Sequence, residues 1–190
     1  MPNEIEIKFV IHDLEAVRSK LHDAGFAEVT ARTHEFNTVY DTPDSAMLSR
    51  GELLRLRQYG ERWTLTHKGL AQPGGKHKTR KETETRVENG EAMHEILTSL
   101  GFVPRFRYEK YRTEFADSSH RGHVVLDETP IGNIGEIEGP AAWIDEVARK
   151  LGLSEADYIT LSYANMFFAW RERTGSAASE MTWDAVGAQR

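Results

Sequence analysis

The sequence contains no cysteine, which excludes three kinds of site at once. Disulfide bonds, metal centres built on thiolates and cysteine nucleophiles all require that side chain. Disulfides are typical of secreted domains and rare in the reducing cytosol. The absence of cysteine therefore favours a cytoplasmic setting, which we state as an expectation.

Long hydrophobic runs are also absent. No apolar stretch approaches the roughly 18 residues of a membrane-spanning helix. The opening residues, Met-Pro-Asn-Glu, carry neither the basic nor the apolar segment of a secretory signal. A net charge of −6 argues against a nucleic acid as partner, because nonspecific nucleic-acid binding usually shows as a basic excess. We expect no membrane and no nucleic-acid partner, while a local basic pocket stays compatible with this charge.

What is present is a chain of ordinary globular composition. Its 190 residues are 39% hydrophobic and 28% charged, which suits one folded domain with a sizeable core. We expect that domain to span residues 1–172, and the small, polar residues 173–190 to form an appended tail.

The predicted elements are few helices and many strands. Apolar residues at helical spacing predict helices at 13–24, 90–100, 141–151 and 162–172. Alternating segments predict strands at 3–11, 28–41, 53–60, 62–68, 77–88, 103–116, 121–129 and 133–139. The first two helices follow strands and end in the same dipeptide, Gly-Phe, which suggests two related halves.

The opening strand, NEIEIKF, alternates charged with apolar residues. Glu4, Glu6 and Lys8 share one face, because successive strand side chains point to opposite sides. For one strand, this pattern usually marks a half-solvated sheet. The alternation recurs, however, in later segments, whose charged faces carry Arg55, Arg57, Lys68, Arg80, Glu82, Glu84, Arg86, Lys110, Arg112, Glu114, Asp127, Glu136 and Glu138.

Two features favour an enclosed pocket over a wet sheet face. Arginine is frequent on these faces, and its planar guanidinium grips phosphate at two points. The helices have one apolar side and can pack on the apolar strand faces, which turns the charged faces toward each other. The predicted fold is therefore α+β, a closed barrel with a polar interior and helices outside. Such burial is costly unless the charges are paired or bind ligands.

The charged residues suit a metal and a polyanion together. Carboxylates two residues apart on a strand lie about 6.5–7 Å apart along one face, and two such pairs on neighbouring strands could hold Mg²⁺ or Mn²⁺. The metal and the basic side together would neutralise a triphosphate, whose displacement reactions depend on positioning and charge stabilisation.

The chain resembles the CYTH, or triphosphate-tunnel, family of class IV adenylyl cyclases, thiamine triphosphatases and inorganic triphosphatases. The signature is Glu-x-Glu-x-Lys at residues 4–8. The likeness continues, over about residues 3–170, through NTVYDTPD (37–44), LLRLR (53–57), LTHKG (65–69), RKETE (80–84), KYR (110–112), VLDE (125–128) and GEIEG (135–139). The family fold, an eight-stranded antiparallel tunnel, agrees with the barrel inferred from the residues.

The resemblance implies a role for each charged position. The carboxylates that it places on the metal side are Glu4, Glu6, Asp127, Glu136 and Glu138. The cations that it places on the phosphate side are Arg55, Arg57, Lys68, Arg80, Lys110 and Arg112. Lys8, with Glu6 and Lys68, is a candidate catalytic residue that binds phosphate or helps to deprotonate the nucleophile. Glu82 and Glu84 are either further metal ligands or groups that orient nearby arginines. For each residue named in this paragraph, the alternative is a structural ion pair within the barrel.

Three activities stay open. A cyclase converts ATP to cyclic AMP and pyrophosphate, a triphosphatase hydrolyses tripolyphosphate, a nucleoside triphosphate or thiamine triphosphate, and a third protein only binds polyphosphate. GNIGEIEGP and LSYANMFF resemble the cyclase-like branch, and residues 160–170 lack the lysine of thiamine triphosphatase-like members. We therefore expect a cyclase that uses Mg²⁺ or Mn²⁺ on a small-molecule triphosphate, with a homodimer left open.

Other motifs receive simpler interpretations. GGKHKT at 74–79 lacks the full phosphate-loop spacing and reads as a mobile hairpin loop, whose Lys76, His77 and Lys78 could approach a substrate. HRGH at 120–123 reads as a surface turn.

Overall fold

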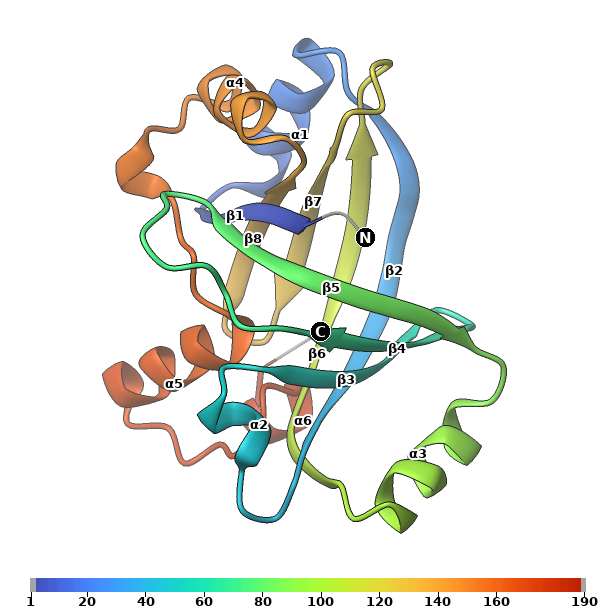
Figure 1. Ribbon diagram of the computed structural model, residues 1–190. Coiled ribbons are helices and arrows are strands. Elements are labelled where there is room, and N and C mark those ends of the chain that lie inside the picture. Colours follow the sequence, from blue (N-terminus) through green and yellow to red (C-terminus); the bar gives the residue numbers. More distant parts are fainter. Residues whose placement is uncertain (1–2, 189–190) are drawn as a thin grey trace.

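The computed structural model describes residues 3–188 and shows a closed barrel of eight antiparallel strands (Figure 1). The strands are β1 (Asn3–Ile11), β2 (Ala27–Asp41), β3 (Leu53–Tyr59), β4 (Arg62–Lys68), β5 (Lys78–Val87), β6 (Val103–Ala116), β7 (His123–Thr129) and β8 (Gly132–Glu138). Their order around the barrel is β1-β5-β4-β3-β2-β6-β7-β8, and β8 pairs with β1 to close it. The predicted fold is confirmed, and each strand begins and ends within two residues of its predicted bounds.

Within residues 3–188, six helices and one short 3₁₀ turn lie outside this barrel (Figure 1). They are α1 (Leu14–Asp23), α2 (Ala46–Ser49), α3 (Gly90–Ser99), α4 (Ala141–Leu151), η1 (Glu155–Asp157), α5 (Tyr163–Thr174) and α6 (Trp183–Val186). The four predicted helices are confirmed as α1, α3, α4 and α5. The three unpredicted elements are only three or four residues long, too short to show a helical period.

The hydrophobic core lies between the outer face of the barrel and the helices. The largest cluster joins Ile7 and Phe9 of β1 to Trp143 and Ile144 of α4. Close packing there depends on Gly135, the β8 partner of Phe9, because a Cβ at this position would lie 2.1 Å from the Phe9 ring. Since these apolar faces point outward to the helices, the charged residues between them must point inward.

The two related halves suggested by the sequence have matching helix ends. Asp13 caps α1 and Asn89 caps α3, and each accepts a hydrogen bond from the backbone amide three residues later. After each helix, a glycine with positive φ is followed by phenylalanine, whose amide bonds back to the carbonyl of Leu21 or Leu97. The β1-α1-β2 and β5-α3-β6 segments therefore share one local design.

The C-terminal residues pack against the barrel. The domain boundary expected after residue 172 falls in the last turn of α5, which ends at Thr174. Beyond it, Met181 and Trp183 are buried, and Met181 forms a parallel bridge with Tyr108 of β6. The Trp183 amide also donates to Glu109 Oε1 at 2.9 Å. Two apolar anchors among small polar residues are enough to fix this segment on the barrel.

Among residues 3–188, no helix has the length and apolar composition that crossing a membrane requires.

Candidate active site

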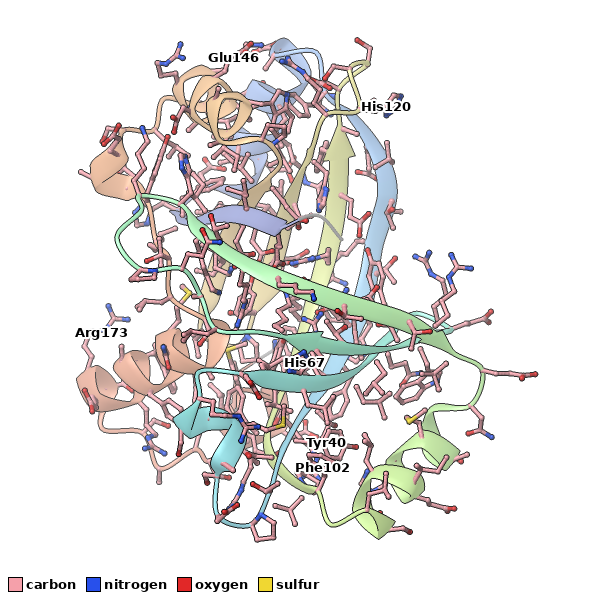
Figure 2. The ribbon with its side chains drawn as sticks, viewed as in Figure 1. Tyr40, His67, Phe102, His120, Glu146 and Arg173 are labelled. Atoms are coloured by element: carbon pink, nitrogen blue, oxygen red, sulfur yellow. The ribbon has the colours of Figure 1, made fainter. Side chains whose placement is uncertain are left out.

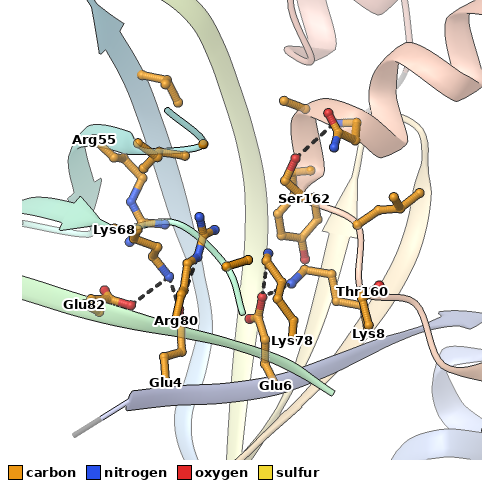
Figure 3. Close-up of a pocket in the computed structure, with 18 of the residues that line it drawn as sticks. Glu4, Glu6, Lys8, Arg55, Lys68, Lys78, Arg80, Glu82, Thr160 and Ser162 are labelled. Atoms are coloured by element: carbon orange, nitrogen blue, oxygen red, sulfur yellow. Dashed lines mark hydrogen bonds and ion pairs between the residues drawn. The ribbon is translucent and has the colours of Figure 1, made fainter. Parts of the chain in front are cut away.

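The inside of the barrel is a tunnel with a volume of about 1100 Å³. It is lined from every wall by the charged faces that the sequence singled out. Glu4, Glu6 and Lys8 enter it from β1, and Figure 3 shows the first two facing the cations of β4 and β5. Of the fourteen predicted site residues, every one except the fully buried Asp127 lines this space directly.

The register of β1 and β8 creates an acidic wall. Glu6 is the direct partner of Glu138, and Lys8 is the direct partner of Glu136. Partners in an antiparallel pair have their Cβ atoms about 4.5–5.5 Å apart on the same face. The two Glu-x-Glu motifs, at residues 4–6 and 136–138, are thereby brought side by side.

Two ammonium groups share one oxygen of Glu6. Lys8 Nζ lies 2.8 Å and Lys78 Nζ 2.9 Å from Glu6 Oε1 (Figure 3). Burial raises the pKa of the Glu6 carboxyl, but the attraction of the neighbouring lysine ammonium groups outweighs the effect of burial. The pKa of Glu6 is therefore held well below its usual value. Burial also disfavours the Lys8 ammonium, yet Glu136 and Glu6 raise the pKa of Lys8 above its ordinary value. Lys78 differs, because burial and its cationic neighbours lower its pKa to about 8.

A basic wall faces these carboxylates from β3, β4 and β5. Lys68 Nζ contacts Glu4 Oε1 at 2.5 Å and Glu82 Oε2 at 2.8 Å (Figure 3). Arg55 donates to Tyr108 OH at 3.2 Å, and the Nε atoms of Arg55, Arg57 and Arg80 are buried without a hydrogen-bond partner. Unpaired buried donors are rare in proteins, so this wall is short of acceptors in the absence of a ligand.

Lys110 and Arg112 on β6 form a second basic wall, and a neighbouring carboxylate neutralises part of its charge. Asp127 on β7 accepts from Lys110 at 2.8 Å and from Arg112 at 2.7 Å and 2.6 Å. Tyr163, the first residue of α5, donates to the same carboxylate at 2.5 Å. Asp127 has no exposed surface. Its oxygens are therefore occupied by three donors, whereas the resemblance places it among the metal ligands.

Glu82 and Glu84 on β5 are the strand partners of Lys68 and Thr66 on β4, and both glutamates contact the basic wall. Glu82 pairs with Lys68, and Glu84 accepts from Thr66 at 2.7 Å and lies 4.0 Å from Arg55. These contacts are those expected of groups that orient neighbouring cations.

Sequence reasoning missed three groups in or beside the tunnel. The first, Glu35, is completely buried and lies 3.5 Å from Lys110, 3.9 Å from Arg57 and 4.0 Å from Arg112. Burial raises the pKa of Glu35, but these cations outweigh that effect and hold the pKa below its usual value. The others, Tyr163 and His123, line the tunnel, as does Lys78, which the sequence placed within reach of a substrate. Alternation could have revealed Glu35 and His123, which are in phase with Asn37 and Asp127.

His123 corrects one interpretation. The sequence places HRGH in a surface turn, and His120 does lie exposed in the loop between β6 and β7 (Figure 2). His123 instead begins β7 and approaches Glu138 Oε2 at 3.4 Å. The short turn ends before this residue, because pairing with Glu138 of β8 already starts there.

The loop between β4 and β5, residues 69–77, is anchored to the helical layer. His77 contacts Asp145 of α4 at 2.9 Å, and Lys76 contacts the same carboxylate at 3.0 Å. Tyr158 donates to it at 3.1 Å. Because the loop lines the tunnel opening, Asp145 fixes one border of that opening.

The acidic wall has oxygen atoms to offer a divalent cation. Glu4 Oε2 is buried without a hydrogen-bond partner, and within the part of the chain that the structure describes Glu138 forms an ion pair only with His123. Residues 3–188 hold no preformed cluster of three histidine, cysteine, aspartate or glutamate side chains. Mg²⁺ is usually bound by one or two carboxylates plus substrate phosphates, so such a cluster is not needed. Glu6 and Glu138, with Glu4 nearby, therefore fit a hard cation that is completed by phosphate and water.

With this geometry in place, comparisons identify the family. The CYTH domain model matches residues 2–163. The chain belongs to the CYTH family, and this membership supports an enzyme that acts on a triphosphate.

Individual relatives agree with this assignment. A Methanocaldococcus jannaschii protein named "Putative adenylate cyclase" is 28% identical over 172 residues, covering 86% of this chain and 97% of that protein. A solved Vibrio parahaemolyticus structure of the same description superposes with a TM-score of 0.76 at 20% identity, covering 87% and 97% of the two chains. A Hippeastrum protein, titled as an adenylyl cyclase homologue with dominant triphosphatase activity, superposes with a TM-score of 0.63 at 18% identity, covering 90% and 96%.

Proposed function

We propose that the protein is a class IV adenylyl cyclase that converts ATP to cyclic AMP and pyrophosphate, with Mg²⁺ or Mn²⁺ as cofactor. One observation carries the proposal: a carboxylate wall with open oxygens faces arginines with unpaired donors across one tunnel. A triphosphate bridged to a divalent cation satisfies both walls at once. The cyclase-like relative and the motifs of the sequence favour this chemistry over hydrolysis.

In this proposal the basic walls position the phosphates. Arg55, Arg57 and Arg80 direct donors into the tunnel, and Lys68 adds a point charge beside them. Lys110 and Arg112 are held rigid by Asp127, so their remaining donors face the substrate without reorganising. The Lys8 ammonium lies beside Glu6 and Glu136, which raise its pKa, and this supports a role for Lys8 in phosphate binding.

The acidic wall holds the cofactor. Glu6 and Glu138 are the proposed ligands, with Glu4 and Glu136 at their sides. When bound, the cation polarises phosphate oxygens and offsets the charge that develops during displacement. The ribose 3′-hydroxyl attacks the α-phosphorus and loses its proton to solvent, the bond between the α-phosphorus and the α,β-bridging oxygen breaks, and pyrophosphate leaves. Asp127 and Glu35 act by orienting cations, because their oxygens already face the β6 side chains.

Triphosphate hydrolysis is the second candidate. The same walls would hold tripolyphosphate, and the fold is shared with the Hippeastrum protein whose title reports triphosphatase activity. In that reaction, water attacks the terminal phosphorus and orthophosphate is released.

A product assay separates the candidates. The protein is incubated with ATP, tripolyphosphate or thiamine triphosphate, each with Mg²⁺ or Mn²⁺ and with a chelator control. We expect metal-dependent cyclic AMP and pyrophosphate from ATP. Orthophosphate as the dominant product would establish the hydrolase instead, and no turnover of any substrate would leave a binding protein.

A further inference from the structure

Tyr163, the first residue of α5, lies where the two basic walls of the tunnel meet. Its side chain lines the same cavity as Arg55 and Lys110, and the residue is only 7% exposed. The preceding residue, Ser162, caps the helix by accepting a hydrogen bond from the Asn165 amide at 3.2 Å, and Figure 3 shows Ser162 beside the pocket. The capped start of α5 therefore fixes the place from which Tyr163 enters the tunnel.

The ring of Tyr163 contacts the supports of both basic walls. Lys110 Nζ lies 4.3 Å and Lys8 Nζ 5.5 Å from the ring centroid. An ammonium group over an aromatic face is attracted by the ring and keeps its charge. The ring also stacks on Tyr108, with centroids 5.7 Å apart and planes inclined by 20°, and the Tyr108 hydroxyl accepts from Arg55. Tyr163 is therefore held in one orientation among the cations.

The Tyr163 hydroxyl competes for an oxygen that the two cations of β6 also use. Asp127 Oδ2 accepts from Tyr163 at 2.5 Å, from Lys110 at 2.8 Å and from Arg112 at 2.6 Å. A carboxylate oxygen offers about two lone pairs to hydrogen-bond donors. Three donors therefore share about two acceptor sites, so Oδ2 cannot hold all three at full strength.

Neither cation of β6 depends on Asp127 alone. Arg112 also donates to Glu136 at 2.9 Å, and Lys110 Nζ lies 3.5 Å from Glu35. Both cations can therefore turn part of their donors toward a ligand, as long as Asp127 does not bind them too tightly. Without the tyrosine hydroxyl, Oδ2 would have one donor for each lone pair, and Asp127 would neutralise more of the charge of Lys110 and Arg112.

We propose that Tyr163 is a positioning residue for the phosphates: its hydroxyl shares Asp127 with Lys110 and Arg112, and so keeps both cations available to the substrate. The inference rests on the proposed function, because the two cations serve this purpose only when phosphates occupy the tunnel. Tyr163 acts through these cations and not on the reacting atoms. The inference gives the start of α5 a part in phosphate binding.

Calorimetric titration of Tyr163→Phe tests the proposal, because this change removes the hydroxyl and keeps the ring on Tyr108. The probes are tripolyphosphate and an ATP analogue with methylene groups at both phosphate bridges, the bis-methylene ATP analogue, each with Mn²⁺ at low temperature. We expect both Kd values to rise about tenfold, the lower end of what a hydrogen bond to a charged group contributes. The two probes should change equally, since they share the phosphate chain.

Steady-state kinetics give a second readout. KM should rise about tenfold while kcat changes by less than about threefold, because the two cations bind the phosphates both before and during the reaction. A purely structural defect would lower the active fraction, and hence kcat, without raising Kd or KM. Tyr111→Phe is the matched control: it removes a hydroxyl from the outer face of β6, where the ring packs on Trp183, and should change neither constant.

A double-mutant cycle shows whether the hydroxyl acts through Asp127. In the Asp127→Asn background, Tyr163→Phe should change Kd by less than about twofold, since the charge for which the donors compete is gone. If Asp127→Asn does not fold, Lys110→Gln takes its place, and the loss caused by Tyr163→Phe should fall to about threefold.

The outcomes separate this inference from the proposed function. Unchanged Kd values for Tyr163→Phe, a loss confined to the ATP analogue, or an equal loss with and without the Asp127 carboxylate would each overturn the role of Tyr163 and leave the triphosphate site in place. If the unmodified protein binds neither probe, the proposed function itself fails, and the role of Tyr163 fails with it.

Discussion

The carboxylates of the tunnel fall into two groups that differ in what surrounds them. On the β2, β6 and β7 side, Glu35 and Asp127 have no exposed surface and lie among lysine and arginine side chains. On the β1 and β8 side, Glu4 Oε2 makes no hydrogen bond and lies 3.8 Å from Arg80 Nε, and the 35% exposed Glu138 side chain lies beside His123. The first group shapes the basic wall, whereas the second keeps oxygens that a cation can approach. The residue type alone does not reveal this difference, because it depends on the side chains that contact each carboxylate.

The largest expected effect is on stability, at Asp127. Asp127→Ala leaves Lys110 and Arg112 buried without their main partner, which should cost about 3–5 kcal/mol of the free energy of unfolding. Glu138→Ala should cost less than about 1 kcal/mol, because the Glu138 side chain is 35% exposed and pairs only with His123. Urea unfolding of both variants measures the difference. Equal losses of unfolding free energy in the two variants would contradict the distinction between the two groups of carboxylates.

The next effect is on metal dependence, at Glu138. We expect Glu138→Gln to lower kcat/KM about 100-fold at limiting Mn²⁺, since a neutral amide is a weaker ligand for a hard cation. Excess Mn²⁺ should restore part of the activity, and a chelator should abolish it in both proteins. Asp127→Asn is the comparison: its remaining activity should have an unaltered Mn²⁺ requirement. A change in metal requirement confined to Asp127→Asn contradicts the assignment.

The third prediction concerns how the basic wall binds phosphate, and it is tested at Arg57. Arg57→Lys keeps the charge but removes the planar fork, so triphosphate binding should weaken about tenfold. The side chain is 19% exposed and its Nε lacks a hydrogen-bond partner, so the fold should be little affected. The Kd for tripolyphosphate, measured by calorimetry, checks this prediction. An unchanged Kd would count against a two-point grip.

The smallest effect concerns the tunnel opening. Asp145→Asn weakens the contacts with Lys76 and His77, which should destabilise the protein by no more than about 1 kcal/mol because these groups are partly exposed. The loop at residues 69–77 should then be cut faster by protease, while the barrel stays intact. Resistance equal to that of the unmodified protein would show that the loop is held by other contacts.

Much of the barrel was predictable because alternation is a strong signal. Charged residues at every second position of β1, β3, β5, β6 and β8 identified the inward face, and the Gly-Phe exits identified two related halves. The short helices α2 and α6 were not predictable, since four residues carry no period. The packing of Met181 and Trp183 on β6 was missed because two anchors in a small, polar segment leave no pattern.

The sequence could predict which residues belong to the candidate site, but not which of them contact each other. Glu4, Glu6, Glu136 and Glu138 could be placed on inward faces, yet only the barrel register makes Glu6 the partner of Glu138. Asp127 is contacted by Lys110 and Arg112 of the neighbouring strand β6 and by Tyr163 of α5, 36 residues further along the chain, and the sequence does not show that these side chains meet. Glu35 was missed although it is in phase with Asn37, because the long strand β2 mixes polar and apolar residues and its charges do not alternate regularly.

A crystal structure with Mn²⁺ and the bis-methylene ATP analogue tests the central claim most directly. Anomalous scattering locates the manganese independently of the protein side chains. We predict a peak between Glu6 and Glu138 that touches the phosphate chain, with the phosphates on Arg55, Arg57 and Arg80. A triphosphate bound outside the barrel, or manganese on Glu35 and Asp127 in place of the β1 and β8 carboxylates, would contradict the account.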